Sequence, residues 1–199
     1  MSGTGRLALW HDCAPGHEAE FEAWYKTEHL PERLSVPGFL RGRRWEAVHG
    51  APRFFTFYET TGPEVLTSAA YRARLEAPTP LTAWIMADVM RDLSRTICRV
   101  EKRAGHLQGG YAMTANGLCD VDIVALAAEP GVARVEVWQA AESAQPMTRE
   151  EAIRGGDERI DNCLMVETLR AVDAARLAST FGTGQIWHLL CEMTAADLA

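Results

Sequence analysis

Tyr25 and His29 form the residue pair in this sequence best suited to proton transfer. An imidazole with an unperturbed pKa of about 6.5 can accept or donate a proton at neutral pH. A phenol one helical turn away could donate a hydrogen bond to a substrate carbonyl or enolate. We therefore predict His29 as the general acid or base and Tyr25 as an oxyanion-stabilising donor. The alternatives are a histidine that caps a helix end and a tyrosine of the core.

The helix that carries this pair is predicted over residues 18–30, because Phe21, Trp24 and Tyr25 recur at helical spacing. At about 100° per residue, His29 should lie at the rim of this aromatic face. It should also lie at the end of the helix, directly before a proline exit. A helix C-terminus stabilises a cation, so we expect this position to strengthen His29 as a base.

Three arginines lie on the strand predicted over residues 39–48. Side chains alternate along a strand, so Arg41 and Arg43 should share a face with Trp45 while Arg44 points the other way. An inward-pointing arginine could hold a carboxylate or an enolate. We predict Arg44 as the third catalytic residue; an ordinary charged strand face is the alternative.

Four further residues are candidates for ligand binding. His11 ends the first predicted strand, which is central in the expected topology, and Tyr58 lies on the third. Trp24 belongs to the aromatic helix face, and Trp84 lies in a short extra helix that could cover an apolar cleft. Each could instead be an ordinary core or strand-end residue.

No motif in the sequence predicts a metal or an organic cofactor. The sequence has no glycine-rich phosphate loop, no GxSxG and no HExxH. The five cysteines are widely spaced without zinc-type spacing, so we expect reduced and mostly buried thiols. A metal would need His11, Asp12 and His29 to converge, and a haem would need His29 as its axial ligand. We predict neither.

Hydrophobic periodicity predicts the order β-α-β-β-α-β for the first half of the chain. Strands are expected over residues 6–13, 39–48, 53–60 and 94–102, and helices over 18–30, 62–76 and 79–90. The second half repeats this pattern at an offset of 93 residues, since Pro37-Gly38, Arg41 and Trp45 recur as Pro130-Gly131, Arg134 and Trp138. The polar stretch 142–160 is predicted as a longer hairpin loop. We infer tandem ferredoxin-like units over residues 1–104 and 105–199, the second degenerate.

A short run in the first half resembles a known signature. Trp24-Tyr25, then Glu28-His29-Leu30-Pro31-Glu32, then Val36-Pro37-Gly38-Phe39 resemble the His-x-Pro and Pro-Gly-Phe pattern of the dimeric α+β barrel superfamily, especially its EthD-like members. The chain resembles a fused version that carries both ferredoxin-like units itself. The resemblance implies a ligand cleft between the sheet and the helices of the first unit. It implies no single activity, because such relatives include cofactor-free monooxygenases, haem-degrading enzymes, cyclases and isomerases.

Composition limits the partners. The formal net charge is -7, which argues against nucleic acid and against an anionic membrane surface. No stretch approaches the roughly 18 apolar residues of a membrane span, and no signal segment precedes the first strand. We expect a cytoplasmic monomer or homodimer whose partner is a small molecule.

These features together predict an α+β enzyme that works without a cofactor on a small, apolar, aromatic or polyketide-like carbonyl compound. The expected step is a proton transfer of lyase, isomerase or cyclase type. A non-catalytic small-molecule binding protein is one alternative. A cofactor-free or haem-dependent oxygenase is another, and a structural partner without a pocket is a third.

Overall fold

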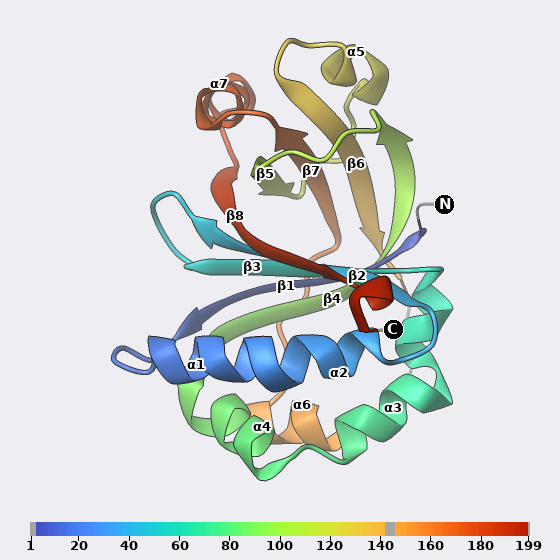
Figure 1. The fold of residues 1–199 in the computed structure, drawn as a ribbon. Helices are drawn as coiled ribbons and strands as arrows, with labels where there is room; N and C mark the ends of the chain where they lie inside the picture. The colour runs from blue at the N-terminus through green and yellow to red at the C-terminus, as the bar shows by residue number, and fades with distance from the viewer. Residues whose placement is uncertain (1–2, 142–145, 199) are drawn as a thin grey trace.

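The computed structural model describes residues 3–141 and 146–198, and their strands form one closed barrel (Figure 1). The barrel order is β1-β3-β2-β8-β5-β7-β6-β4, with every neighbouring pair antiparallel. The strands are β1 (Gly5–Cys13), β2 (Phe39–Ala47), β3 (Phe54–Thr60), β4 (Met90–Ala104), β5 (Tyr111–Asn116), β6 (Val132–Ala140), β7 (Asn162–Thr168) and β8 (Gln185–Thr194). The predicted α+β class is confirmed.

The two halves of the chain contribute strands in the same order. The first four lie as β4-β1-β3-β2 and the last four as β8-β5-β7-β6. Helices cover the outer faces of both halves (Figure 1). Those of the first half are α1 (Glu18–Trp24), α2 (Leu30–Leu34), α3 (Ala69–Glu76) and α4 (Pro80–Trp84), and those of the second are α5 (Ile123–Ala127) and α7 (Ala171–Phe181).

Two strands close the barrel by belonging to both halves. β4 pairs with β1 through residues 90–99 and with β6 through residues 98–104. β8 pairs with β5 through residues 185–188 and with β2 through residues 187–194. The two sheets therefore share their edge strands, and no helix is needed to join them.

Aromatic side chains fill the barrel interior. Alternate residues of each strand point inward, as the pleat requires, and the interior cluster is built largely from Trp10, Trp45, Phe55, Phe57, Trp138 and Trp187. A second apolar cluster lies between the first four strands and their helices, and a third beneath α5 and α7. The barrel is thus a packed core, and space for a ligand has to be sought outside it.

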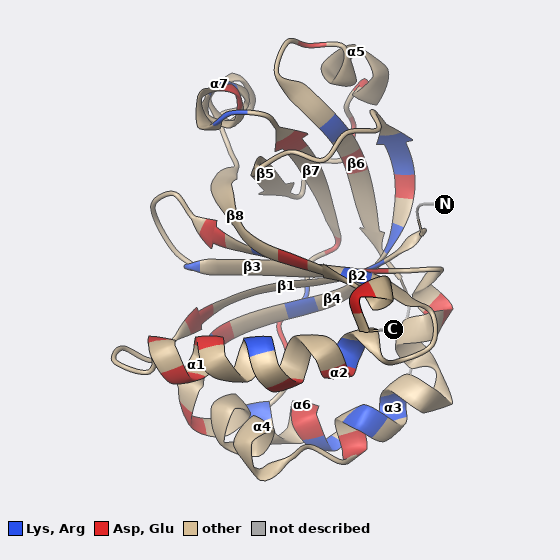
Figure 2. Ribbon diagram, viewed as in Figure 1, with Lys and Arg blue, Asp and Glu red and all other residues tan. Residues whose placement is uncertain are grey.

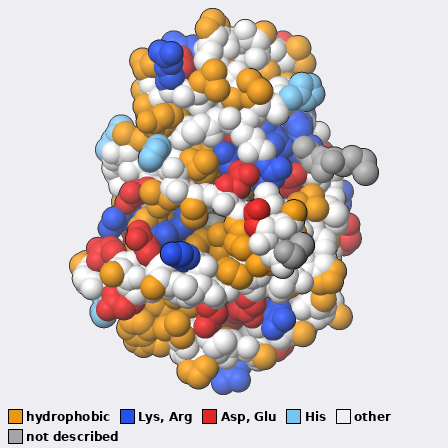
Figure 3. Space-filling model, in the orientation of Figure 1, with side chains coloured by type: hydrophobic (Ala, Val, Ile, Leu, Met, Phe, Trp, Pro, Cys, Tyr) orange, Lys and Arg blue, Asp and Glu red, His pale blue; other side chains and the backbone are white. Residues whose placement is uncertain are grey.

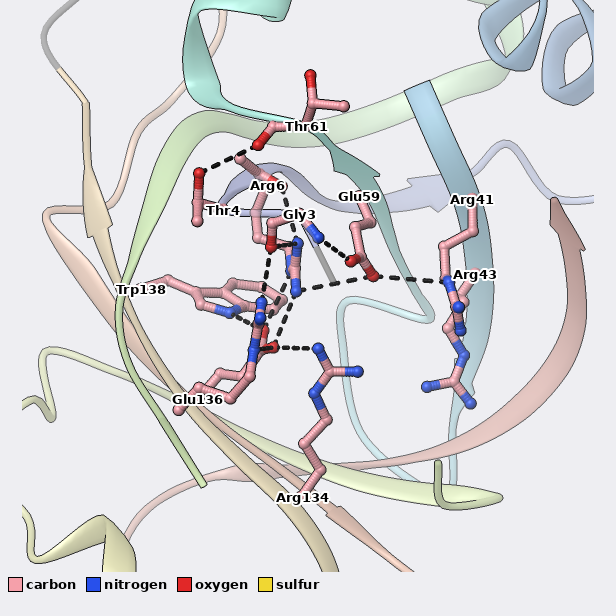
Figure 4. Close-up of polar contacts among 12 residues, drawn as sticks. Gly3, Thr4, Arg6, Arg41, Arg43, Glu59, Thr61, Arg134, Glu136 and Trp138 are labelled. Atoms are coloured by element: carbon pink, nitrogen blue, oxygen red, sulfur yellow. Dashed lines mark hydrogen bonds and ion pairs between the residues drawn. The ribbon is translucent and has the colours of Figure 1, made fainter. Parts of the chain in front are cut away.

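Buried charges fill one end of the barrel (Figure 4). Glu136 on β6 accepts hydrogen bonds from Arg6 Nη2 at 2.8 Å, Arg103 Nε at 2.7 Å and the indole N–H of Trp138 at 2.7 Å. Burial alone would raise the pKa of Glu136, but the cations of Arg6, Arg134 and Arg103 outweigh it and lower the pKa to about 2. This carboxylate is therefore ionised and linked to strands from both halves.

A second group of buried charges lies at the same end of the barrel, and we call the two groups together the charged layer. Arg43 on β2 pairs with Glu167 on β7 at 2.6 Å. Glu59 accepts the backbone N–H of Gly3 at 2.6 Å, and Glu167 accepts that of Gly109 at 2.8 Å. Ion pairs of this layer thus cross from the first half to the second.

The predicted strands are confirmed to within a few residues, except that β4 is longer at both ends. Three other predicted features are wrong. The helix expected over residues 62–76 begins as a 3-10 turn, Pro63–Thr67, and α3 starts afresh behind Ser68, whose hydroxyl accepts the N–H of Tyr71. The predicted loop 142–160, of which 142–145 lie outside the described residues, contains helix α6 (Arg149–Arg154). The thiols are free, but only Cys98 and Cys163 are buried. No helix of the described ranges is long and apolar enough to span a membrane.

The charged layer yields a stability prediction. Glu136→Gln leaves three guanidinium groups without their shared carboxylate, so the free energy of unfolding should fall by about 3–5 kcal/mol. Urea denaturation followed by tryptophan fluorescence measures it. Glu129→Gln is the matched control, because its pair with Arg176 at 2.5 Å is exposed and should contribute at most about 1 kcal/mol. Equal losses in the two variants would contradict the role given to the layer.

Candidate active site

A widened helical turn positions the predicted pair. Residues Tyr25–His29 form a π-helical turn, η1, between α1 and α2, in which the N–H of Leu30 donates to the carbonyl of Tyr25. The wider turn brings Trp24, Tyr25, His29 and Leu30 all onto the buried face. Such turns are rare and occur frequently at functional sites.

This turn overturns the predicted rim position of His29. The helix does not end at Leu30 but continues through Pro31 to Leu34. Pro31 is the second residue of α2, within the first turn after η1, where a proline is tolerated. His29 is consequently 6% exposed and sits in the middle of a longer helical segment, away from the C-terminal carbonyls.

The surroundings of His29 keep its imidazole neutral. Burial and then the cations of Arg33, Arg154 and Arg44 lower the pKa of His29 well below its usual 6.5. The expectation that the helix end would strengthen it as a base is therefore wrong. The ring lies 4.3 Å from that of Trp24 and 5.4 Å from that of Tyr25, between centroids. Its Nδ1 is buried and has no hydrogen-bond partner within the described residues.

Two phenols lie beside the imidazole. The hydroxyl oxygens of Tyr25 and Tyr58 are 3.1 Å apart, and the ring of Tyr58 meets that of His29 edge-on at 6.3 Å. Burial raises the pKa of both tyrosines. Both therefore remain protonated at neutral pH and can donate hydrogen bonds.

Arg44 is a buried cation held by aromatic rings. Its guanidinium carbon lies 4.3 Å from the ring centroid of Phe54, 4.9 Å from Tyr25 and 5.0 Å from Phe21. Its Nε and Nη2 are buried without a hydrogen-bond partner in the described part of the chain. Aromatic faces stabilise the cation but do not take its N–H donors, so Arg44 retains donors for an anion.

Two of the predicted ligand-binding residues, His11 and Trp24, already have partners within the protein. His11 lies between Phe21 and Phe54, with its Nδ1 3.1 Å from the carbonyl of Asp12. Burial and then Arg44 lower the pKa of His11 to about 3. The indole of Trp24 donates to Thr82 Oγ1 at 2.9 Å and so ties α1 to α4.

Trp84 is not brought to the site. It is 36% exposed and meets His17 edge-on, with centroids 5.6 Å apart. The structure therefore brings together His29, Tyr25, Tyr58 and Arg44, with His11 and Trp24 at the borders of the group. Within residues 3–141 and 146–198, no three His, Cys, Asp or Glu side chains are grouped as metal ligands.

A cavity of about 20 Å³ adjoins His29 and Tyr58. Its other walls include Leu9, Tyr71, Met86 and Arg33. This volume holds about one water molecule, far less than the several hundred Å³ of an ordinary ligand site. On the face seen in Figure 3, hydrophobic side chains gather between α1–α2 and the barrel, so the apolar layer around the site reaches the surface there.

Sequence reasoning missed the charged residues that close this cavity. Arg33 pairs with Glu150 of α6 at 2.5 Å, and Arg95 on β4 pairs with Glu151 at 3.2 Å. Arg33 follows His29 by four residues, a spacing that the sequence shows. Its partner could not be found in that way, because Glu150 lies 117 residues further along the chain.

Comparison with known proteins places the fold. No protein-family model matches the chain, and no curated protein matches its sequence. An anthrone oxidase-like protein of known structure has a TM-score of 0.61 at 10% identity, over 100% of this chain and 96% of its own. A proposed monooxygenase from Fusobacterium nucleatum subsp. nucleatum reaches 0.55 at 8%, covering 98% and 96% of the two chains. One from Lactobacillus acidophilus reaches 0.53 at 10%, covering 96% and 97%.

These neighbours have the dimeric α+β barrel fold, and the closed barrel described above agrees with it. The resemblance seen in the sequence is confirmed at the level of fold. At identities near one in ten, the likeness shows the fold alone. The EthD-like assignment stays a prediction.

The two buried histidines yield a pH prediction. Their folded-state pKa values lie below 6.5 because of burial and nearby cations: Arg44 for His11, and Arg33, Arg154 and Arg44 for His29. Below about pH 6.5 the two histidines are protonated in the unfolded chain but stay neutral in the folded one. The free energy of unfolding is therefore highest above that pH and decreases as the pH falls. For His11 the loss should reach about 2 kcal/mol at about pH 5.

Urea denaturation between about pH 7.5 and about pH 5 measures this loss. His29→Gln should reduce the pH dependence, whereas His188→Gln should not, because His188 is exposed on β8. A pH dependence that is the same in all three proteins would contradict the buried, neutral state of His29.

Proposed function

We propose that this protein is an enzyme that removes a proton from carbon next to the carbonyl group of a small aromatic or polyketide-like compound. One observation carries the proposal: the neutral imidazole of His29 lies buried near two protonated phenols and the Arg44 cation, and its Nδ1 and two Arg44 nitrogens have no hydrogen-bond partner among the described residues. His29 accepts the proton. Arg44 and the hydroxyls of Tyr25 and Tyr58 stabilise the enolate oxygen.

The low pKa of His29 is compatible with this role. Transfer of a proton from carbon to the imidazole creates an imidazolium and an enolate together, so the charge of the site does not change. The cations that oppose protonation of His29 alone then stabilise the enolate. General base catalysis of this kind accelerates a reaction by roughly 10²–10⁴-fold, and an oxyanion donor adds about 10²–10³-fold.

A cofactor-free oxygenase is the second candidate, favoured by the neighbours named as monooxygenases and as anthrone oxidase-like. It begins with the same deprotonation. The carbanion then reacts with O₂, so that a CH₂ group and O₂ become C=O and H₂O. A haem-dependent form would use His29 as its axial ligand, and the cavity of about 20 Å³ would have to open for haem as it does for an aromatic substrate.

We also infer that the two halves are copies of one ferredoxin-like unit, residues 1–104 and 105–199. The repeated strand order supports this, as do β2 and β6, which begin and end 93 residues apart. The equivalent contacts of Gly3 with Glu59 and of Gly109 with Glu167 support it too. In the second half Asp122 replaces His29 at this offset and caps α5, so the site belongs to the first copy. The chain can pair its own two sheets, which is compatible with a monomer.

The function is tested with anthrone as the probe substrate. His29→Ala should lower its turnover by about 10²–10⁴-fold, because the base is lost while the surrounding aromatic rings remain. Absorbance follows the product, and an oxygen electrode measures O₂ consumption; uptake of one O₂ for each molecule converted identifies the oxygenase.

His188→Ala is the control, since that side chain is exposed and stacks on Tyr111. Circular dichroism checks that both variants fold. Full activity in folded His29→Ala rejects the assignment. Tight binding of anthrone without conversion would instead identify a binding protein.

A further inference from the structure

Helix α6 belongs to the second half of the chain but closes the site of the first. It lies between β6 and β7 in the sequence, yet it packs beside α3 and next to the π-helical turn Ile85–Val89 that follows α4 (Figure 1). Its acidic and basic residues lie close to the charged residues of α3 (Figure 2). Without α6, the cavity beside His29 would lose the wall formed by Glu150 and Arg154.

The contacts that hold α6 over this site are mainly ionic. Glu150 pairs with Arg33 at 2.5 Å, and Glu151 pairs with Arg95 at 3.2 Å. Arg154 Nη2 lies 2.9 Å from Asp157, and its Nη1 contacts Met86 Sδ of the first half at 3.6 Å. The first half thus contributes two cations, α6 brings Glu150 and Glu151 to them, and Asp157 beyond the helix lies 3.6 Å from Arg95.

The two arginines form a built anion site. Arg33 is 1% exposed, and its guanidinium lies over the ring of Tyr71 at 5.7 Å. Arg95 is 6% exposed and donates to the hydroxyl of Tyr71 at 3.1 Å. Glu150 does not satisfy Arg33 fully, since Arg33 Nη1 is buried without a partner among the described residues. Both arginines line the cavity beside His29.

The segment after α6 provides a hinge. Gly155 and Gly156 have left-handed φ values of 82° and 98°, and neither has a neighbouring atom within 4 Å of an added Cβ. The next attachments are Asp157, whose carboxylate lies 3.6 Å from Arg95, and Glu158, whose carbonyl accepts the N–H of Arg95 at 2.8 Å. A rotation at the two glycines would therefore move α6 and break the Arg154–Asp157 pair while β4 stays in place.

We propose that Arg33 and Arg95 bind a carboxylate group of the substrate, and that Glu150 and Glu151 occupy this subsite until the substrate displaces α6. Opening without a ligand would leave buried Arg33 without a carboxylate and Arg95 with Asp157 alone, which is costly. A carboxylate that replaces Glu150 removes that cost, so an aromatic acid opens the pocket more readily than a neutral compound such as anthrone. Arg33 follows His29 by one helical turn, so the two side chains leave the same face of the helix about 6 Å apart at Cβ. This inference rests on the proposed function.

Calorimetric titration with 2-naphthoate tests the subsite, with 2-acetonaphthone as the neutral probe. Glu150→Gln removes the internal competitor, so naphthoate should bind about tenfold more tightly than to the wild type, and Arg33→Met should abolish binding. Glu129→Gln, at the exposed pair with Arg176, should bind as the wild type does. Equal naphthoate affinity in the wild type and Glu150→Gln would overturn the proposal.

Hydrogen exchange of the wild-type protein provides a measurement that does not depend on a variant folding. Naphthoate should increase exchange of residues 149–156 more than acetonaphthone does at the same concentration; an equal or smaller increase with naphthoate would overturn the proposal. His29→Gln separates the two proposals. If naphthoate still displaces α6 while turnover does not depend on His29, the proposed function fails alone. If turnover depends on His29 but naphthoate leaves α6 in place, only the subsite fails.

Discussion

The ion pairs between Arg6 and Glu136 and between Arg43 and Glu167 are the constraint on which the rest of this structure depends. They cross the end of the barrel interior and connect strands of the first half to strands of the second. Side chains alternate along a strand, so the pairing that turns Arg43 inward must turn Arg44 outward, beneath α1. A shift of β2 by one residue would exchange the two arginines. The charged layer therefore fixes the register of β2 and with it the position of Arg44, although the charged layer and the candidate site lie on opposite faces of the sheet.

The same alternation explains what the sequence could predict. Placing Arg43 with Trp45 and Arg44 on the opposite face needed only the period of a strand, and the structure agrees, with the Arg43 guanidinium 4.6 Å from the Trp45 ring. The π-helical turn could not be predicted in that way. Its wider spacing is a tertiary effect that buries Tyr25 and His29 together, and counting at about 100° per residue cannot detect it.

The long-range ion pairs could not be predicted from the sequence either. Arg6 and Glu136 are 130 residues apart, and no local pattern relates them. Helix α6 is a different case, because its start carries a readable signal. Thr148 and Glu151 form a capping box, which was hidden by the polar composition of the surrounding stretch. Its position over the first half, by contrast, follows only from charges that the fold brings together.

Unsatisfied polar atoms gather around His29 to an unusual degree. Its own Nδ1, Nη1 of Arg33, and Nε and Nη2 of Arg44 are all buried without partners within the described residues. A folded protein ordinarily satisfies such atoms because each one left unpaired is costly. His29 and Arg33 line the small cavity, and Arg44 lies behind Tyr25; such free donors are what a site for an oxygen-rich anion requires.

The charged layer also has a consequence for how the two halves can assemble. β2 and β6 begin and end 93 residues apart, so the position of Arg43 in the first half corresponds to that of Glu136 in the second. Two N-terminal halves brought face to face would set Arg6 against a second Arg43 where it now meets a carboxylate. On the proposed duplication, the two halves are complementary in the manner of two different subunits. A single half, released from its tether, should then pair less well with a copy of itself than with the other half.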